Sequence, residues 1–187
     1  ETPKVGDEAF TKVHNLIVGN NLTASLAAYN DFQRAGLNAL LLSSCLEGQA
    51  RDVGTMFASI AKEIVTSRNP VSRPAGIVAG GETTVTVVGK GKGGRNQEIA
   101  LGAALKIGSA DGVVIASIST DGVDGPTDAA GAVVDGRTLI RCRELGLNPR
   151  EFLTENDSYS LFSSLGDLIF TGPTGTNVCD VSVIVVL

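Results

Sequence analysis

Residues 89–98 read GKGKGGRNQE and connect a predicted strand to a predicted helix. The preceding residues 83–88 (TTVTVV) are rich in β-branched side chains, which favour a strand. Residues 96–105 (NQEIALGAAL) predict a helix with Asn96 as its N-cap. Glycines allow backbone N–H groups to approach an anion, and the first turn of a helix presents unpaired N–H groups. The stretch also carries the cations Lys90, Lys92 and Arg95. The sequence therefore predicts a site for phosphate or carboxylate groups, with a flexible basic loop as the alternative.

The size and composition of the chain limit what it can be. Its 187 residues suit one domain of ordinary size or two small ones, and 43% of them are hydrophobic while 19% are charged. A formal net charge of −5 argues against sequence-independent binding of nucleic acid. No apolar run approaches the roughly 18 residues needed to span a bilayer, and no basic-then-apolar leader is seen. We therefore expect no nucleic-acid or membrane partner and a cytoplasmic location.

The cysteines and the single histidine offer little catalytic chemistry. Cys45, Cys142 and Cys179 are odd in number, far apart and without CxxC spacing, so neither a disulfide framework nor a zinc site is indicated. His14 precedes an apolar run, and we expect a structural role for it. A Ser-His-Asp triad has little support, because the candidate serines lack the glycines of a nucleophile elbow.

The first part of the chain alternates strand and helix patterns. The expected elements are a strand at 16–18, a helix at 22–35, a buried strand at 38–44 and a helix at 48–67. Asn20 and Asn21 are candidate N-caps of the first helix, and Gly36 is expected to close it in the left-handed conformation. Apolar strands that alternate with helices predict a parallel sheet covered on both faces. Residues 68–74 (RNPVSRP) contain two prolines and predict a linker.

The second part, from residue 75, has shorter elements. The expected strands are at 75–79, 83–88, 112–119, 168–170 and 181–187, and the expected helices are at 96–105, 137–145, 151–153 and 158–164. We expect these elements to form a smaller α/β domain with a mixed sheet, separated from residues 1–74 by the linker.

Two further loops at strand ends carry candidate chemistry. Asp121, Asp124 and Asp128 follow a buried strand, and in open α/β sheets ligands bind at the carboxyl ends of strands. One or two of these carboxylates would suit a mostly hydrated Mg²⁺ or a substrate hydroxyl. The alternative is that they form Asx-turns or cap a helix, which has most weight for Asp128. Residues 171–177 (TGPTGTN) offer hydroxyls, N–H groups and the Asn177 amide to phosphate oxygens, although the same residue types make ordinary turns.

Residues 89–94 also satisfy the dinucleotide-binding pattern GxGxxG. An acid that binds the ribose is expected about 20 residues further on, but Asp111 precedes the next strand and Asp121 falls later than expected. Two lysines inside the loop suit free phosphates better than a pyrophosphate turn. We therefore treat the match as coincidental, and the Walker A pattern GxxxxGK[ST] does not occur in the sequence.

Four stretches are long enough to compare with known families. They are GGETTVTVVGKGKGGRNQEIAL from residue 80, STDGVDGPTDAAGAVVDG from residue 119, NDSYSLF from residue 156 and GDLIFTGPTGTNVCDV from residue 166. In that order they resemble the C-terminal MOFRL domain of the class II glycerate 2-kinases. The earlier IVGNN and LEGQARDVG resemble the end of that family's Rossmann-like N-terminal domain. The resemblance extends over residues 16–187 and rests on specific motifs.

The resemblance implies ATP-dependent phosphorylation of D-glycerate to 2-phosphoglycerate, with Mg²⁺, in a cleft between two domains. It implies that Arg95 contacts the reacting phosphoryl group or the glycerate carboxylate, because its planar fork suits bidentate binding of oxyanions. Asp121 and Asp124 would then serve the metal or the substrate hydroxyl. The expected nucleotide-side residues are Asn20, Asn21, Glu47, Gly80, Gly81, Glu82, Lys90, Lys92, Thr174 and Asn177. For Glu82 the alternative is an exposed residue at the start of a strand.

The resemblance also assigns residues 1–74 to a partial Rossmann-like, nucleotide-side domain and residues 75–187 to a MOFRL-like α/β domain. The family's earlier strands, including a catalytic lysine, have no counterpart in the sequence, so we expect a fragment with an incomplete active site. The missing N-terminal part is then an expected partner, and an exposed strand edge would favour a homo-oligomer. Two alternative functions remain open: a hydroxypyruvate reductase that uses a nicotinamide cofactor, and a non-catalytic ligand-binding domain.

Overall fold

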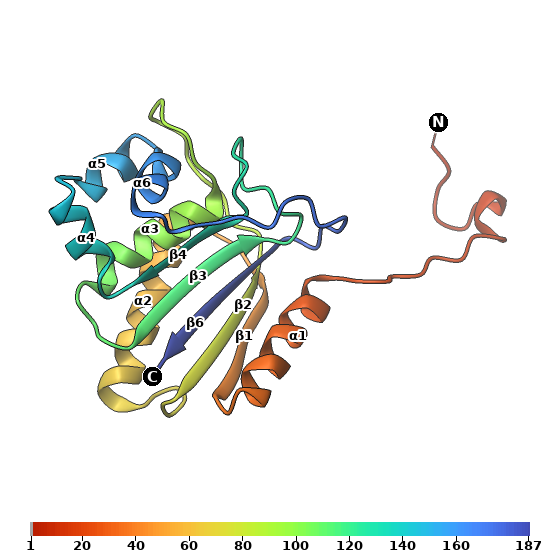
Figure 1. Cartoon of the computed structure of the whole chain (residues 1–187). Helices are drawn as coiled ribbons and strands as arrows, with labels where there is room; N and C mark the ends of the chain where they lie inside the picture. The colour runs from red at the N-terminus through yellow and green to blue at the C-terminus, as the bar shows by residue number, and fades with distance from the viewer. Residues whose placement is uncertain (1) are drawn as a thin grey trace.

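A six-stranded mixed sheet runs through the molecule (Figure 1). Its strands are β1 (Asn38–Leu46), β2 (Ala75–Gly81), β3 (Val113–Ser119), β4 (Gly131–Asp135), β5 (Leu168–Ile169) and β6 (Asp180–Val186). In the computed structural model, which describes residues 2–187, the strand order is β1-β2-β6-β3-β4-β5. β1 and β2 pair in parallel, whereas all other neighbours in this sheet pair antiparallel. The expected α/β class with a mixed sheet is therefore confirmed.

Helices cover both faces of the sheet. They are α1 (Asn21–Arg34), α2 (Ala50–Ser67), α3 (Arg95–Ile107), α4 (Thr138–Glu144), α5 (Pro149–Thr154) and α6 (Ser158–Leu165). α2 and α3 pack against each other on one face, and α1 lies against β1 and β2 on the other (Figure 1). Residues 2–20 project away from the body of the molecule and contain the short 3-10 helix η1 (Glu8–Phe10) (Figure 1).

The elements of the first part follow from their sequence patterns. Apolar side chains of α2 recur at helical spacing and are buried against the sheet, namely Val53, Phe57, Ala61 and Ile64. α1 begins as predicted, with Asn20 as its N-cap: the Asn20 side-chain oxygen accepts a hydrogen bond from the Thr23 N–H at 2.9 Å. Gly36, with φ of 80°, follows the end of the helix in the left-handed region, as expected.

The strand register gathers several loops at one end of the sheet. Gly81, at the end of β2, pairs with Asp180 at the start of β6. Ser119, at the end of β3, pairs with the same Asp180, and Leu46, at the end of β1, pairs with Gly81. The loops that follow β1, β2 and β3 therefore meet the loop that precedes β6. This end of the sheet carries most of the candidate site residues.

The predicted strand at 83–88 is wrong. β2 ends at Gly81, and the segment that follows makes one isolated bridge, between Thr84 and Gln49. Val87 and Val88 are each 71% exposed. β-branched side chains favour a strand only where a sheet can receive them, and both edges of β2 are already paired with β1 and β6.

Other local expectations also need correction. Residues 16–18 form an exposed stretch rather than a strand, because no strand of the described chain lies beside them to pair with. β1 is half-exposed rather than buried, since it is the edge strand. β4 was not anticipated, because its five residues directly follow a turn-rich loop. α3 begins at Arg95 with Gly94, not Asn96, as its N-cap.

The predicted domain boundary at residue 74 stays a prediction, although β1 and β2 on either side of it pair in the same sheet. The outer edge of β1 is an edge of the described sheet, but the homo-oligomer that it would favour also stays a prediction. Among residues 2–187, no helix combines the length and the apolar character needed to cross a bilayer.

α2 and α3 approach each other closely enough for their backbones to touch. A methyl group added at Gly54 of α2 would lie 2.0 Å from the carbonyl oxygen of Ile99 in α3. A methyl group at Gly102 of α3 would lie 2.3 Å from the carbonyl oxygen of Arg51 in α2. Glycine inside a helix costs about 1 kcal/mol relative to alanine. The close helix contact is therefore what favours glycine at both positions.

We predict that Gly54→Ala destabilises the protein, although alanine is the better helix former. The gain in helix propensity is about 1 kcal/mol, whereas overpacking of a core costs about 1–3 kcal/mol and more where backbone atoms cannot move aside. Urea unfolding should therefore show a net loss of at least about 1 kcal/mol. Ser59→Ala, on the exposed face of α2, is the control and should stay within about 0.5 kcal/mol of the wild type. Equal stability of the two variants would contradict the close packing.

Candidate functional site

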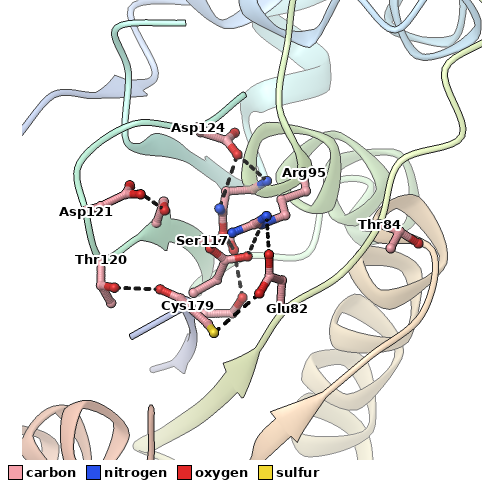
Figure 2. A network of polar contacts seen from close by, with 12 residues as sticks. Glu82, Thr84, Arg95, Ser117, Thr120, Asp121, Asp124 and Cys179 are labelled. Carbon is pink, nitrogen blue, oxygen red and sulfur yellow. Dashed lines mark hydrogen bonds and ion pairs between the residues drawn. The ribbon is translucent and has the colours of Figure 1, made fainter. Parts of the chain in front are cut away.

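A buried carboxylate closes the N-terminus of α3 (Figure 2). Asp124 Oδ1 accepts hydrogen bonds from the backbone N–H of Asn96 at 3.1 Å and from its side-chain amide at 3.2 Å. Asp124 Oδ2 accepts from the backbone N–H of Gln97 at 2.9 Å and from its side-chain amide at 3.0 Å. The backbone donors belong to the first turn of the helix, where N–H groups have no partner within the helix. Asp124 therefore occupies the position that the sequence suggests for a bound anion.

The surroundings of Asp124 are those of a side chain that caps α3. Burial raises its pKa, because desolvation disfavours the ionised carboxylate, while the hydrogen bonds from Gln97 and Asn96 oppose this shift. Both carboxylate oxygens are already occupied by two donors each. A metal ion would have to displace the donors that hold the helix start. The catalytic and metal-binding roles of Asp124 stay predictions.

Arg95, the first residue of α3, lies in a network of carboxylates (Figure 2). Its Nε and one terminal NH₂ group donate to the two oxygens of Asp180 at 2.6 and 3.0 Å. Its other NH₂ group donates to Glu82 at 2.7 Å. The hydrogen bond with Asp180 is the main cause that raises the pKa of Arg95. The guanidinium fork thus holds a carboxylate of the protein, and the side chain, 28% exposed, keeps further donor capacity for a ligand.

The glycines of residues 89–93 face another part of the protein. A methyl group added at Gly89, Gly91 or Gly93 would lie 2.2 Å from an atom of residues 155–158. These glycines alternate with Lys90 and Lys92, which are both exposed. Close packing against residues 155–158 therefore accounts for the repeated glycines without any bound anion. We call residues 88–93 the lysine loop.

Tyr159 contacts the lysine loop through both its ring and its backbone. The Lys92 Nζ atom lies 4.2 Å from the centroid of the Tyr159 ring, which is a cation–π contact. The Tyr159 hydroxyl donates to Asp128 at 2.7 Å. The Tyr159 bond lowers the pKa of Asp128. Asp128 therefore has a structural partner in Tyr159, while the turn or cap role expected as its alternative stays a prediction.

A pocket of about 560 Å³ opens beside Arg95. Its polar walls include Glu82, Glu98 and Asn156, and its apolar walls include Val85 and Pro126. Thr83 also lines the pocket, and its buried hydroxyl has no hydrogen-bond partner within residues 2–187. A buried hydroxyl without a partner is unfavourable unless a ligand or water supplies one.

The acidic loop and the second Gly-rich loop come together, as their positions at strand ends suggest. Asp121 Oδ1 accepts from the Ser119 hydroxyl at 2.8 Å and from the Val123 N–H at 3.0 Å. Its Oδ2 accepts from the Asn177 amide at 3.1 Å, and the Asp121 carbonyl accepts from the Thr174 N–H at 3.2 Å. The Val123 bond, followed by the Ser119 bond, lowers the pKa of Asp121. Asp121 is therefore an ionised and partly exposed carboxylate beside Asn177.

Two of the predicted nucleotide-side residues also hold α1 on the sheet. The Asn21 side-chain amide donates to the carbonyl oxygens of Val178 and Asp180 at 2.8 and 2.9 Å. A methyl group added at Gly80 would lie 1.9 Å from the Asn21 side-chain oxygen. Asn20, the N-cap of α1, is exposed. The ligand-binding roles of these residues stay predictions.

The remaining nucleotide-side candidates lie around the end of β2. Gly81 has φ of 150°, and a methyl group there would lie 2.2 Å from the Leu46 backbone of β1. Glu82 is exposed and, besides its pair with Arg95, accepts from the Cys179 Sγ at 3.4 Å (Figure 2). Glu47 is exposed at the end of β1 and stays a prediction.

Three buried polar residues that shape the site were not foreseen: Glu98, Asn156 and Asp180. Glu98 accepts from the Arg51 Nε at 2.7 Å, and Asn156 contacts both Glu98 and the lysine loop. Asp180 begins an apolar strand, a place where an acid usually meets solvent. The one feature of the sequence that could have pointed to Asp180 is its position at the end of a predicted strand, where the other candidate loops also lie.

Comparison with known proteins gives consistent matches. The sequence model of the MOFRL family matches residues 75–180. The chain is 44% identical over 180 residues to a glycerate 2-kinase from Pyrococcus horikoshii, covering 96% of this chain and 41% of that protein. It is 43% identical over 188 residues to a putative hydroxypyruvate reductase from Agrobacterium vitis, covering 100% of this chain and 42% of that protein.

A solved structure is also similar. The crystal structure of a glycerate kinase from Thermotoga maritima matches with a TM-score of 0.89 at 43% identity, covering 90% of this chain and 41% of that chain. The chain thus spans about two fifths of the length of these relatives.

We predict that Asp124→Asn destabilises the protein. An asparagine would turn an NH₂ group toward donors of Asn96 or Gln97, and each buried donor left unpaired costs about 1–3 kcal/mol. For a chain of this size, 1 kcal/mol corresponds to about 2–4 °C in melting temperature. Asp128→Asn, the same change at an exposed residue, is the control and should melt within about 2 °C of the wild type. Equal melting temperatures for both variants would contradict the buried cap.

Proposed function

The chain belongs to the MOFRL family, and from this premise we propose that it forms part of a D-glycerate 2-kinase. In this reaction the 2-hydroxyl oxygen of D-glycerate attacks the γ-phosphorus of ATP, the bond to the ADP oxygen breaks, and the hydroxyl proton leaves. The products are 2-phosphoglycerate and ADP. The names of the relatives from Pyrococcus horikoshii and Thermotoga maritima support the proposal. Because the chain spans about two fifths of them, the rest of the active site would come from the remaining part of such an enzyme.

The position of Arg95 is the observation that carries the proposal. Asp180 and Glu82 hold its guanidinium at the wall of the 560 Å³ pocket. Phosphoryl transfer depends mainly on positioning and on charges aimed at the transferring group. A cation that is already held in place needs no reorganisation when the reaction occurs, so Arg95 suits the stabilisation of the phosphoryl oxygens or the glycerate carboxylate.

Exposed groups on the neighbouring loops would complete the phosphate contacts. Lys90 and Lys92 carry positive charge outward from the lysine loop. Thr174 and Asn177 offer exposed polar groups beside Asp121. In the proposal, the lysines gather the negative charge of ATP, and Thr174 and Asn177 contact phosphate oxygens. Asn20, Asn21, Glu47, Gly80, Gly81 and Glu82 remain proposed nucleotide-side residues.

Mg²⁺ bound with ATP would neutralise phosphate charge in this reaction. Asp121 fits this role, because it is ionised, partly exposed and placed at the end of β3. Asp124 fits it only if the cap of α3 opens, since its oxygens are occupied. Within residues 2–187, no group of three or more His, Cys, Asp or Glu could hold a metal ion. The proposed ion would therefore take its other ligands from phosphates and water.

The name of the Agrobacterium vitis relative raises the second candidate, a reductase with a nicotinamide cofactor. The GxGxxG pattern marks a dinucleotide site only when it directly follows a strand. Here β2 ends at Gly81, well before Gly89, and the glycines pack against residues 155–158. These contacts favour the kinase. A non-catalytic ligand-binding role, a cytoplasmic location and a homo-oligomer stay predictions.

We predict that this chain binds ATP·Mg and does not bind NADH tightly, because it has a cationic loop but lacks the dinucleotide context. Isothermal titration calorimetry with each ligand measures this directly. An ADP-release assay on the full-length kinase polypeptide that the proposal implies should show turnover with D-glycerate and none with hydroxypyruvate. Tight NADH binding without ATP binding would overturn the kinase proposal, and ATP binding without turnover would favour the non-catalytic alternative.

We predict that Arg95→Lys lowers kcat/KM of the full-length polypeptide for D-glycerate by about two orders of magnitude or more. Lysine keeps the positive charge but loses the paired N–H donors of the guanidinium, so one hydrogen bond that stabilises the negative charge of the transition state is lost. Arg34→Lys is the matched control, because Arg34 forms an exposed ion pair with Asp31 and does not line the pocket. Circular dichroism of both variants should show the native fold. Normal turnover in Arg95→Lys would remove this residue from the proposed catalytic set.

A further inference from the structure

Asn156 has an unusual backbone conformation and a complete set of hydrogen bonds. Its φ is 54°, in the left-handed region that asparagine tolerates better than most residues, and it is 6% exposed. Its side-chain oxygen accepts from the backbone N–H groups of Val88 at 2.8 Å and Gly89 at 3.0 Å. Its amide donates to the Thr86 carbonyl at 3.3 Å and to Glu98 Oε2 at 3.1 Å. Both lone pairs and both N–H groups of the carboxamide are therefore in use.

Glu98 connects this asparagine to two helices. Glu98 belongs to α3 and is buried, and its Oε1 accepts from the Arg51 Nε of α2 at 2.7 Å. Its Oε2 accepts from Asn156. A buried carboxylate is tolerated when it is paired and hydrogen-bonded, and both oxygens meet that condition here. Asn156 is thus fixed against the helix pair α2 and α3.

Backbone contacts continue the attachment along the lysine loop. The Gly91 N–H donates to the Glu155 carbonyl at 2.8 Å, and the Lys92 N–H donates to Asp157 Oδ1 at 3.0 Å. The Lys92 carbonyl accepts from the Tyr159 N–H at 2.9 Å. Together with the Val88 and Gly89 bonds, these contacts tie successive backbone groups of the loop to residues 155–159. The loop is therefore held along its length, while its two lysine side chains remain exposed.

We propose that Asn156 is the positioning residue of the lysine loop, setting where Lys90 and Lys92 meet the phosphates of a nucleotide. This inference rests on the proposed kinase function for its ligand. Asn156 itself acts through the loop: it fixes the Val88 and Gly89 amides on one side and Glu98 on the other. Preorganised cations bind an anion without the cost of ordering a loop first. Asparagine suits the position because it combines a left-handed backbone, an acceptor and a donor, whereas aspartate would place a second carboxylate against Glu98.

The test compares Asn156→Gly with two other changes. Glycine keeps the left-handed backbone and removes all the side-chain bonds, so it isolates the carboxamide. Asn148→Gly is the matched control, because Asn148 is an N-cap on α5 and glycine at an N-cap costs only a few tenths of a kcal/mol. A Lys90→Ala/Lys92→Ala double variant removes the charges that the loop presents.

Amide hydrogen exchange on this chain gives the first readout. Asn156→Gly should abolish the protection of the Val88 and Gly89 amides, while Asn148→Gly leaves it unchanged. Unchanged protection in Asn156→Gly would overturn the inference whether or not the chain belongs to a kinase. If Asn156→Gly does not fold, exchange in the wild type decides: the Val88 and Gly89 amides, which donate to Asn156, should be protected like the Gly91 amide, which donates to the Glu155 carbonyl. Rapid exchange of both amides in the wild type would overturn the inference.

Kinetics of the full-length polypeptide give the second readout. Asn156→Gly should raise KM for ATP about tenfold with kcat changed less than about threefold, the pattern of lost ground-state binding. In the Lys90→Ala/Lys92→Ala background, the same change should have no further effect on KM, because the positioned charges are already gone. Additive effects on KM would show that Asn156 affects ATP binding independently of the two lysines and would overturn the positioning role. A wild type without ATP turnover would overturn the proposed function and leave the exchange result to decide whether Asn156 holds the loop.

Discussion

The contact between the Asp124 carboxylate and the first turn of α3 is the constraint on which the site depends. Desolvation of this buried carboxylate is unfavourable, and four hydrogen bonds from Asn96 and Gln97 offset it. The contact joins the loop after β3 to the helix that packs against α2, β3 and β4. Arg95 is the first residue of that helix and Glu98 lies one turn further along, so the cap sets the direction of both side chains.

Carboxylates of the protein occupy the places that a basic, Gly-rich stretch suggests for a ligand. Asp124 takes the helix N-terminus, Asp180 takes the fork of Arg95, and Glu98 pairs with Arg51. The glycines pack on residues 155–158. Arg95 is therefore held at the pocket by the protein's own carboxylates, and the proposed kinase function would need such a preorganised cation for phosphoryl transfer. The groups still available to bind an anion are the exposed part of Arg95 and the side chains of Lys90 and Lys92.

Sequence patterns predicted most of the elements, because helices such as α2 bury one stripe and β3 and β6 are apolar runs. They failed where pairing decides the structure. Residues 83–88 have a strand-like composition, but both edges of β2, the strand that they follow, are already paired, and they make one isolated bridge. Residues 16–18 pair with no strand of the described chain. The strand-end positions of Asp121 and Asn177 predicted that their loops would meet, and the two side chains are hydrogen-bonded. The sequence could not show that Asp124 lies buried against a helix 28 residues away in the chain, and the site role of Arg95 stays a prediction. The same limit hid Asp180 and Asn156, since their partners are known only from the three-dimensional contacts.

Titration of the chain with inorganic phosphate, followed by ¹H–¹⁵N NMR, tests most directly whether the start of α3 belongs to the fold or to a ligand. The amide signals of Asn96 and Gln97 report on the cap, and those of Lys90 and Lys92 report on the exposed loop. If Asp124 holds the helix start, the Asn96 and Gln97 signals stay unchanged while the lysine-loop signals shift. If the Asn96 and Gln97 signals shift most, phosphate has replaced Asp124, and the account of a helix start closed by the protein's own carboxylate is wrong.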